Sequence, residues 1–317
     1  MDTEDLELFA RSLRHATETY TDAALDAALE ELGWHDALTV DAHATVSLLF
    51  ELQGAANASS SALDHVVAHA LGRELAPTTG VVLPALGRWD PPGQLEGDRV
   101  TVRGVATSAL AGRASALVVT TTGDKPVAVE IDTASLTLRP VRGIDPWLGL
   151  IEVSGEAAVS GEAAVTDWPA AVALGQMAVA HELVGASRQM LTLARDHAID
   201  RIQFDRPIAM FQAVRHRLAE TLVAIEAGAA ALDAAWQDPA PQTAAMAKAV
   251  TGRGARTAAR HSQQVLAGIG FTTEHPLHRY VRRVLVLDEL LGPTRSLTRA
   301  LGEDVLRTRT LPPLLPL

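Results

Sequence analysis

The sequence contains no cysteine, which excludes structural disulfides, thiolate metal sites and cysteine nucleophiles. Cations are also scarce: 27 Lys and Arg stand against 38 Asp and Glu, for a formal net charge of -11. Proteins that wrap phosphate backbones carry the opposite excess. No apolar run approaches the roughly 20 residues of a membrane-spanning helix, and the first seven residues are acidic where a secretory signal would be basic. These absences predict a soluble cytoplasmic protein with neither nucleic acid nor membrane as a partner.

The chain has 317 residues, of which 48% are hydrophobic and 21% charged, a balance typical of globular proteins with a sizeable core. Residues 1–76 alternate polar and apolar positions at helical spacing, and we expect an N-terminal helical domain there. Asp22 is a candidate N-cap and Gly33 a candidate helix stop. Within this region, residues 41–57 and 60–72 each place leucines and valines on one face.

Residues 77–165 have a different texture and predict a middle antiparallel β domain. Short β-branched runs cover residues 100–105, 117–122, 127–131 and 136–141. Turn residues separate them at 96–98 and at 123–126, and short loops of this kind join antiparallel strands.

Residues 166–317 predict a C-terminal domain resembling a four-helix bundle. A long helix begins at Thr166-Asp167-Trp168-Pro169, where a capping residue is followed by proline in the first turn, and runs to about Asp200. Further helices are expected over residues 207–236, 243–266, 275–291 and 293–309, and an extended arm over 311–317. The fold class is therefore α+β, with strands between two helical regions.

This order disfavours a nicotinamide-binding sheet, which would alternate strands and helices. The two G-x-G occurrences, at 252–254 and 268–270, both lack a third glycine and neither follows a strand. Hydrolase and zinc chemistry lack support too. His181-Glu182 has no second histidine at the required spacing, no G-x-S-x-G elbow occurs, and a proline lies between His275 and His278.

Two segments resemble the acyl-CoA dehydrogenase family. Residues 201–212 read R-I-Q-F-D-R-P-I-A-M-F-Q, similar to the family pattern R-x-Q-F-G-R-P-I-x-x-F-Q, and residues 264–272 read Q-V-L-A-G-I-G-F-T, similar to Q-x-x-G-G-x-G-F-T. The resemblance runs through most of the chain and is strongest from about residue 171 to 291. It implies an acyl-CoA dehydrogenase-like fold and contact with FAD.

In that family the arginine of the first pattern reaches the FAD pyrophosphate of a neighbouring subunit and the final glutamine assists it. The resemblance assigns these roles to Arg201 and Gln212, with Gln203 and Phe204 beside them. A guanidinium with several donors suits a pyrophosphate, and a glutamine amide suits its neighbouring oxygens. The plainer alternative is that Arg201 only caps the carboxyl end of the long helix.

The second pattern faces the adenosine end of FAD and assigns contacts to Gln264, Ala267 and Gly268. Ala267 stands where the family has glycine, so a methyl group there could block a close approach or a positive φ. Read without the resemblance, the glycines of this segment simply terminate a helix.

The family's catalytic glutamate has no counterpart in this chain. Its chemistry needs a carboxylate that takes an α-proton while a hydride passes to the flavin. One family location for the base is just before the glycine of an E-G-T stretch, which is Leu291 here. The other lies in the long helix and is Gly175, next to Gln176. Asp288 and Glu289 lie close in sequence but on other helix faces, and we expect them to be solvated or to pair with Arg282 and Arg283. Glu182 is expected to be structural.

Retention of the FAD-reaching half and loss of the base predict a subunit that works with a partner. The region matching the family's T-E-P-x-A-G-S-D stretch, residues 82–90, has also lost its polar groups. The chain resembles the shorter subunit of α2β2 acyl-CoA dehydrogenases of steroid side-chain degradation, which share one FAD per heterodimer. The resemblance thus implies a glutamate-bearing catalytic partner that binds most of the acyl-CoA, and an electron-transferring flavoprotein as acceptor. No metal site and no catalytic residue are expected in this chain.

Two alternatives stay open at this point. One is a flavin-dependent oxygenase of the same fold, which would need no α-proton base but would need its own flavin-ring pocket. The other is a purely structural partner without FAD contact. Ala267 favours this alternative, whereas Arg201 and Gln212 disfavour it.

Overall fold

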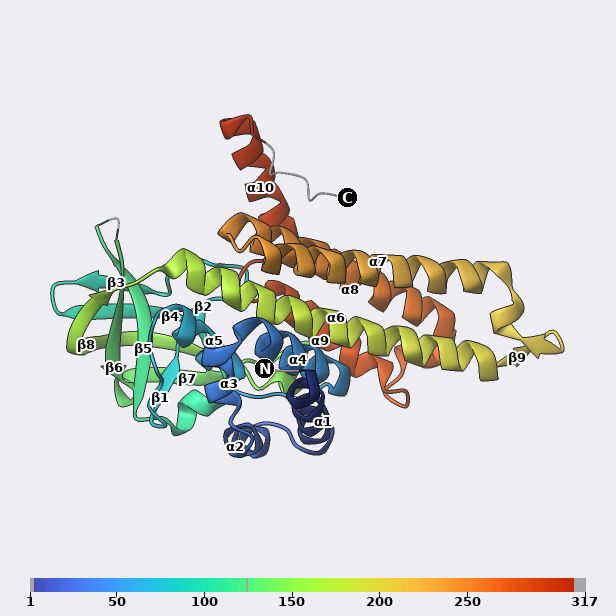
Figure 1. The fold of residues 1–317 in the computed structure, drawn as a ribbon, viewed down its shortest axis with the longest axis horizontal. Helices are drawn as coiled ribbons and strands as arrows, with labels where there is room; N and C mark the ends of the chain where they lie inside the picture. Colours follow the sequence, from blue (N-terminus) through green and yellow to red (C-terminus); the bar gives the residue numbers. More distant parts are fainter. Residues whose placement is uncertain (1–2, 124, 311–317) are drawn as a thin grey trace.

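The computed structural model describes residues 3–123 and 125–310, and it places a β-barrel between two helical regions (Figure 1). The first region contains α1 (Thr3–Thr19), α2 (Ala23–Glu31), α3 (Trp34–Val40), α4 (Ala42–Ala56) and α5 (Ala62–Ala70). Gly33, at φ 69°, separates α2 from α3, as predicted. Asp22 precedes α2 but makes no side-chain cap. The Asp41 carboxylate does cap α4, accepting a hydrogen bond from the Ala44 amide at 3.0 Å.

The strands form one sheet that closes on itself. They are β1 (Thr79–Val81), β2 (Leu83–Pro84), β3 (Gly93–Glu96), β4 (Arg99–Ala106), β5 (Ser115–Thr122), β6 (Lys125–Asp132), β7 (Leu136–Pro140) and β8 (Ile151–Val165). The predicted runs became β4 to β7, and the predicted turns join β3 to β4 and β5 to β6; Asp124 of the second turn lies outside the described residues.

Strand β8 was not predicted, and it closes the barrel. Its first half pairs with β4 and β7, and its second half pairs with β6. Its sequence, I-E-V-S-G-E-A-A-V-S-G-E-A-A-V, is rich in alanine, glycine and glutamate, which have little preference for strands. Neighbouring strands decide its conformation, so local composition could not reveal it. Valines and isoleucines from β4, β5, β6 and β8 fill the interior of the barrel.

The C-terminal region is built on one long helix, α6 (Trp168–Asp200), capped by Asp167 as predicted. After it come β9 (Ile202–Gln203), β10 (Arg206–Pro207), α7 (Gln212–Gln237), α8 (Pro241–Leu266), α9 (Leu277–Glu289) and α10 (Thr294–Thr308). Short 3-10 turns, η4 (Ile208–Met210) and η5 (Ala267–Phe271), precede α7 and follow α8. The prediction that α7 begins at residue 207 was wrong, because residues 202–207 form a hairpin that reverses the chain. The predicted arm at 311–317 lies outside the described residues.

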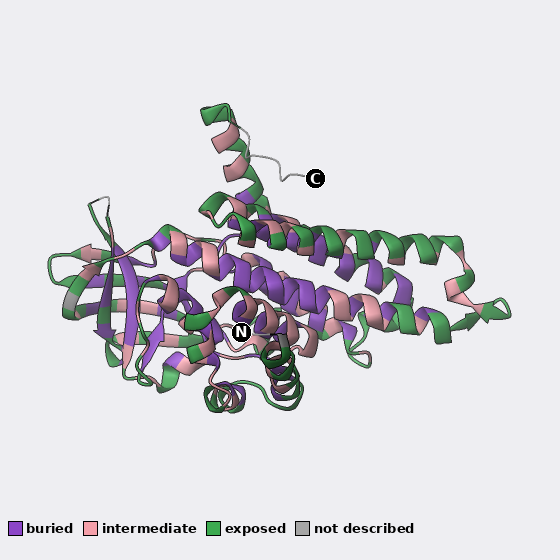
Figure 2. Ribbon diagram, in the orientation of Figure 1, coloured by how far each residue is buried: buried purple, intermediate pink, exposed green. Residues whose placement is uncertain are grey.

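Helix α6 changes from buried to exposed along its length (Figure 2). Nearly every residue from 175 to 187 is buried, because α4, α5, α8 and α9 surround this part. Its last turns, together with the hairpin and the start of α7, are largely exposed and project away from the barrel. This projecting end carries the first predicted FAD segment.

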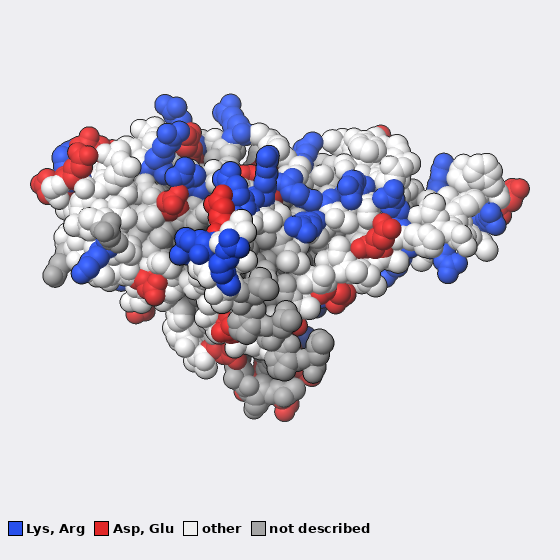
Figure 3. Space-filling view, turned by 90° about the horizontal axis from the view of Figure 1, so that it is seen from above, with Lys and Arg blue, Asp and Glu red and all other residues white. Residues whose placement is uncertain are grey.

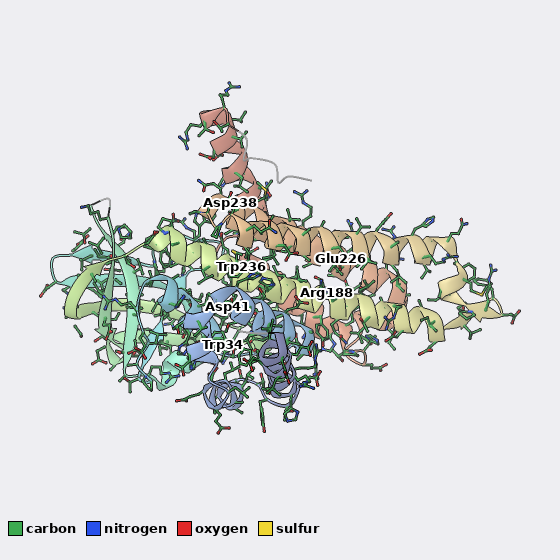
Figure 4. The ribbon with its side chains drawn as sticks, in the orientation of Figure 1. Trp34, Asp41, Arg188, Glu226, Trp236 and Asp238 are labelled. Atoms are coloured by element: carbon green, nitrogen blue, oxygen red, sulfur yellow. The ribbon has the colours of Figure 1, made fainter. Side chains whose placement is uncertain are left out.

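Side chains of α6 hold α4 and α7 beside it (Figure 4). The Arg188 guanidinium contacts the Glu51 carboxylate on α4 and lies 3.6 Å from the Glu226 carboxylate on α7. Near the end of α7, the Trp236 ring stacks on His43 of α4 at 4.6 Å between centroids, and its Nε1 donates to His181 Nε2 of α6 at 3.0 Å. Burial lowers the pKa of His181 to about 3, so this imidazole accepts as a neutral ring.

Glu182 has the structural role expected of it. Its carboxylate lies 3.2 Å from the guanidinium of the fully buried Arg283, which also pairs with Asp145 at 2.8 Å. The expectation for Asp288 was wrong, whereas the Glu289 side chain is partly exposed to solvent. Asp288 is buried and pairs with Arg256 of α8 at 2.6 Å, while Glu289 lies 3.8 Å from the same arginine. Sequence proximity favoured Arg282 and Arg283, but the packing of α8 on α9 brings Arg256 instead.

Within residues 3–123 and 125–310, no helix has both the length and the apolar character to cross a membrane.

Candidate functional site

The first predicted segment forms a tight hairpin at the projecting end of α6. Gln203 pairs with Arg206 and Ile202 with Pro207, so Phe204 and Asp205 are the two residues of the turn. Both have positive φ, 53° and 61°, as both central residues of a type I′ turn must. The family pattern has glycine at the second position, and the aspartate here tolerates this conformation better than most side chains.

The predicted contact residues of this segment face solvent. Arg201, Gln203, Phe204 and Gln212 are all exposed, and Phe204 is exposed to 84%. Among the described residues, the side chains of Arg201 and Gln212 have no hydrogen-bond or ion-pair partner, and Gln203 donates only to the neighbouring Ile202 carbonyl. Their polar groups are therefore free to bind something outside this chain.

The second predicted segment follows α8. Gln264, Ala267 and Gly268 are exposed, and Ala267 has φ 52° and ψ -131°, a conformation that glycine adopts far more readily. Alanine is therefore strained at this position, where the family pattern has glycine. A Cβ on Gly268 would meet no atom within 4 Å, so its backbone is open to close approach.

Both segments lie toward the end of the helical bundle that is distant from the barrel (Figure 1). Helix α7 starts and α8 ends there, because the two helices pack antiparallel. Burial is the largest cause that lowers the pKa of His197, one turn before Arg201, and of His275, just after η5. His197 adds to the lowering of the pKa at His275.

These residues fit a flavin dinucleotide held from outside. Free guanidinium and amide groups suit a pyrophosphate, and exposed aromatic rings such as Phe204 and Phe271, the latter 71% exposed, need a covering surface.

The two family locations of the catalytic base meet at one point inside the chain, and a leucine fills it. A Cβ placed on Gly175 would lie 2.6 Å from Leu291 Cδ1, 3.5 Å from Val67 and 3.9 Å from Leu63. Leu291 is 1% exposed and has φ 53°. Neither Leu291 nor Gly175 can take a proton, and no larger side chain fits at 175 while Leu291 stays in place.

Buried polar groups fix the loop that carries Leu291. The Gln176 amide donates a hydrogen bond to the Leu291 carbonyl at 2.8 Å. The Lys248 ammonium donates hydrogen bonds to the carbonyls of Asp288 at 3.0 Å and Gly292 at 2.8 Å. Burial lowers the pKa of Lys248 to about 8. On the other side of the loop, a Cβ on Gly292 would lie 2.9 Å from the Trp89 ring. The position where family members place a base is therefore tightly packed.

A further cavity lies away from these segments. It has a volume of about 1120 Å³ between α2, α3, α5 and the turn η1 (Ser108–Gly112), and none of the predicted contact residues lines it. A hollow of about 300 Å³ lies beside the first segment, lined by Gln212, Arg215, His216 and Ala219. Sequence reasoning did not include Arg215 or His216, although their spacing from Gln212 along a helix would have placed them on one face.

Residues 170–306 match the model of the acyl-CoA dehydrogenase C-terminal domain. This stretch, which is the C-terminal helical region of the chain, is similar to that domain. The acyl-CoA dehydrogenase IpdE2 of Mycobacterium tuberculosis is 32% identical over 167 residues, which cover 53% of this chain and 51% of that protein. IpdE2 of Mycolicibacterium smegmatis is 32% identical over 127 residues, covering 40% of this chain and 41% of that protein. The chain thus matches about half the length of these curated relatives.

Solved structures show that the acyl-CoA dehydrogenase fold extends over the whole chain. A chain of the ChsE4-ChsE5 complex from Mycobacterium tuberculosis superposes with a TM-score of 0.79 at 19% identity, covering 98% of this chain and 99% of that one. A chain of the Tcur3481-Tcur3483 steroid acyl-CoA dehydrogenase gives 0.77 at 21% identity, covering 96% and 99%. The predicted fold class is confirmed.

Proposed function

We propose that this chain is the non-catalytic subunit of a heteromeric, FAD-dependent acyl-CoA dehydrogenase of the cytoplasm. In this proposal it completes the FAD site of a glutamate-bearing partner in an α2β2 assembly. The observation that carries the proposal is the packed point where Leu291 and Gly175 meet, since neither can serve as the base. The exposed, unpartnered groups at the far end of the bundle support the second half of the proposal.

The chemistry divides between the two chains. FAD, when bound, accepts the hydride removed from the acyl-CoA. Arg201 and Gln212 hold the pyrophosphate, while Gln203 and Phe204 shape the hairpin around it. Gln264, Ala267 and Gly268 lie along the adenosine end. The partner binds most of the acyl-CoA and takes the α-proton, and an electron-transferring flavoprotein receives the electrons. This chain contributes position and charge to the site rather than a reacting group.

The substrate class follows from similarity. One structural neighbour is a steroid acyl-CoA dehydrogenase and another is a complex of two different proteins. We therefore propose a CoA ester of a steroid side chain as the substrate of the assembly.

Flavin content tests the proposal. The chain expressed alone should be colourless and inactive, and the chain co-expressed with a glutamate-bearing acyl-CoA dehydrogenase partner should purify yellow with one FAD per pair. Arg201→Ala should weaken FAD retention in the complex by about 10- to 100-fold, because a hydrogen bond to a charged group contributes about 1.5–3 kcal/mol. Arg195→Ala is the matched control, since Arg195 is an exposed α6 arginine that pairs with its neighbour Asp196 at 2.7 Å.

Two results would contradict the proposal in different ways. A yellow assembly of this chain alone that oxidises acyl-CoA would refute the non-catalytic role. Unchanged FAD occupancy in Arg201→Ala would refute the FAD contact and would indicate a purely structural subunit.

A further inference from the structure

We propose that Arg206, held in place by the ring of Phe211, is a second cation for the FAD pyrophosphate beside Arg201. This inference rests on the proposed function and adds a residue that the family pattern did not assign. Three observations carry it: the face of the hairpin on which Arg206 lies, the contact that fixes its guanidinium, and the absence of a carboxylate partner.

The hairpin places Arg206 on the same face as the predicted contact residues. Gln203 and Arg206 are directly opposite each other in the antiparallel pair, so their side chains share a face. Successive residues alternate between faces, so Arg201 lies on the face of Gln203. The Ile208 amide donates to the Arg201 carbonyl at 2.9 Å and continues the pairing to this residue. Two guanidinium groups and one amide therefore extend from one side of a short hairpin.

Aromatic rings hold the Arg206 guanidinium at the start of α7. Its central carbon lies 4.4 Å from the centre of the Phe211 ring, and Phe204 meets that ring edge-on at 6.0 Å between centroids. A cation above an aromatic face is attracted by the ring's negative face. Phe211 immediately precedes Gln212, the first residue of α7, and provides no side-chain cap.

The amino end of α7 is an unfavourable location for the Arg206 cation unless an anion is present, whereas Arg201 follows the carboxyl end of α6. The amino end of a helix carries partial positive charge and unpaired amide donors, so it attracts anions and repels guanidinium groups. Neither Arg201 nor Arg206 has an ion pair to a carboxylate in the described part of the chain. Arg201, Arg206 and the start of α7 together match a ligand with two neighbouring negative charges, which is the charge of the FAD pyrophosphate.

The rate of FAD release from the assembled complex tests this inference without relying on turnover. Flavin fluorescence after dilution, measured across a range of salt concentrations, reports the rate. Arg206→Gln should raise the rate about tenfold and reduce its dependence on salt, because one charge contact to phosphate is lost. Phe211→Leu keeps the charge but removes the ring, so it should raise the rate by about two- to fivefold. Arg195→Gln, at an exposed arginine of α6, the helix that ends just before Arg201, should leave the rate unchanged.

The outcomes separate this inference from the proposed function. If Arg201→Ala speeds release but Arg206→Gln does not, Arg206 is not a phosphate contact and the proposed function stands. If neither variant changes release, both are wrong. If Arg206→Gln speeds release equally at low and high salt, its effect is not electrostatic and the inference fails.

Discussion

At the scale of single residues, positive φ angles occur in both predicted FAD segments and at Leu291. Seven described residues other than glycine have positive φ, and Phe204, Asp205, Ala267 and Leu291 are among them. The first three belong to the two predicted FAD segments, and the fourth fills the position of the missing base. Left-handed conformations of such residues cost free energy, and they persist where the surrounding structure determines them.

For Ala267, both the direction and the size of a change in folding stability can be predicted. Replacing it with glycine should stabilise the folded chain by about 1 kcal/mol, because φ 52° with ψ -131° suits glycine and strains alanine. Urea unfolding followed by circular dichroism measures the change. Ala230→Gly, at an exposed position within α7, is the matched control and should destabilise by about 1 kcal/mol. If both variants destabilise alike, the strain inferred at Ala267 is absent.

At the scale of helices and strands, the sequence predicted what depends on local pattern. β-branched runs located β4 to β7, the apolar face of residues 41–57 located α4, and the cap at Asp167 located the start of α6. Strand β8 and the late start of α7 depend on neighbouring strands and on a hairpin, and composition could not reveal them.

The candidate site also has residues that the sequence could predict and a contact that it could not. The motif residues, including Arg201 and Gln264, could be named from the sequence because their spacing is local. The meeting of Gly175 with Leu291 could not, because it depends on how α6 packs against the loop after α9. The pairing of Asp288 with Arg256 was mispredicted for the same reason.

Helix α5 provides a pH-dependent prediction, because Asp64 is buried where α5 meets the barrel. Its carboxylate accepts a hydrogen bond from the Thr107 hydroxyl at 3.0 Å, while its other oxygen has no partner. Burial raises the pKa of Asp64 from 3.8 to about 7. The folded state therefore binds more protons than the unfolded state between these values, and stability falls as pH rises through this window.

Asp64→Asn should remove the fall in folding stability that accompanies rising pH. At pH 8 the variant should be more stable than the parent by a few kcal/mol, since one pKa unit corresponds to about 1.4 kcal/mol. At about pH 4 the difference should be small, because the parent carboxyl is then protonated in the folded chain. Urea unfolding at the two pH values measures this. Asp233→Asn, at an exposed position on α7, should show no such dependence. An Asp64 variant that is equally destabilised at both pH values would contradict the prediction.

At the scale of the whole molecule, charge and exposure are unevenly distributed. The first 41 residues contain eleven Asp and Glu but two arginines. Arginines gather instead on the face formed by α7, α8 and α10 (Figure 3), where Arg215, Arg253, Arg260, Arg295 and Arg299 are exposed. The exposed rings of Phe204 and Phe271 lie toward one end of the bundle. A chain with an overall negative charge thus has an anion-attracting face that leads to the proposed FAD contacts.

Hydrogen exchange should show the two FAD segments behaving as one site in the assembled complex. Residues 201–212 and 264–272 are far apart in sequence, and both are largely exposed in the chain alone. Adding the partner and FAD should slow amide exchange in both segments together, because one dinucleotide spans them. Removing FAD from the complex should release both, and Arg201→Ala should shift both toward the FAD-free pattern. The β5–β6 hairpin, residues 115–132, is the internal control and should not change. Protection of one segment without the other would mean that no single ligand joins them.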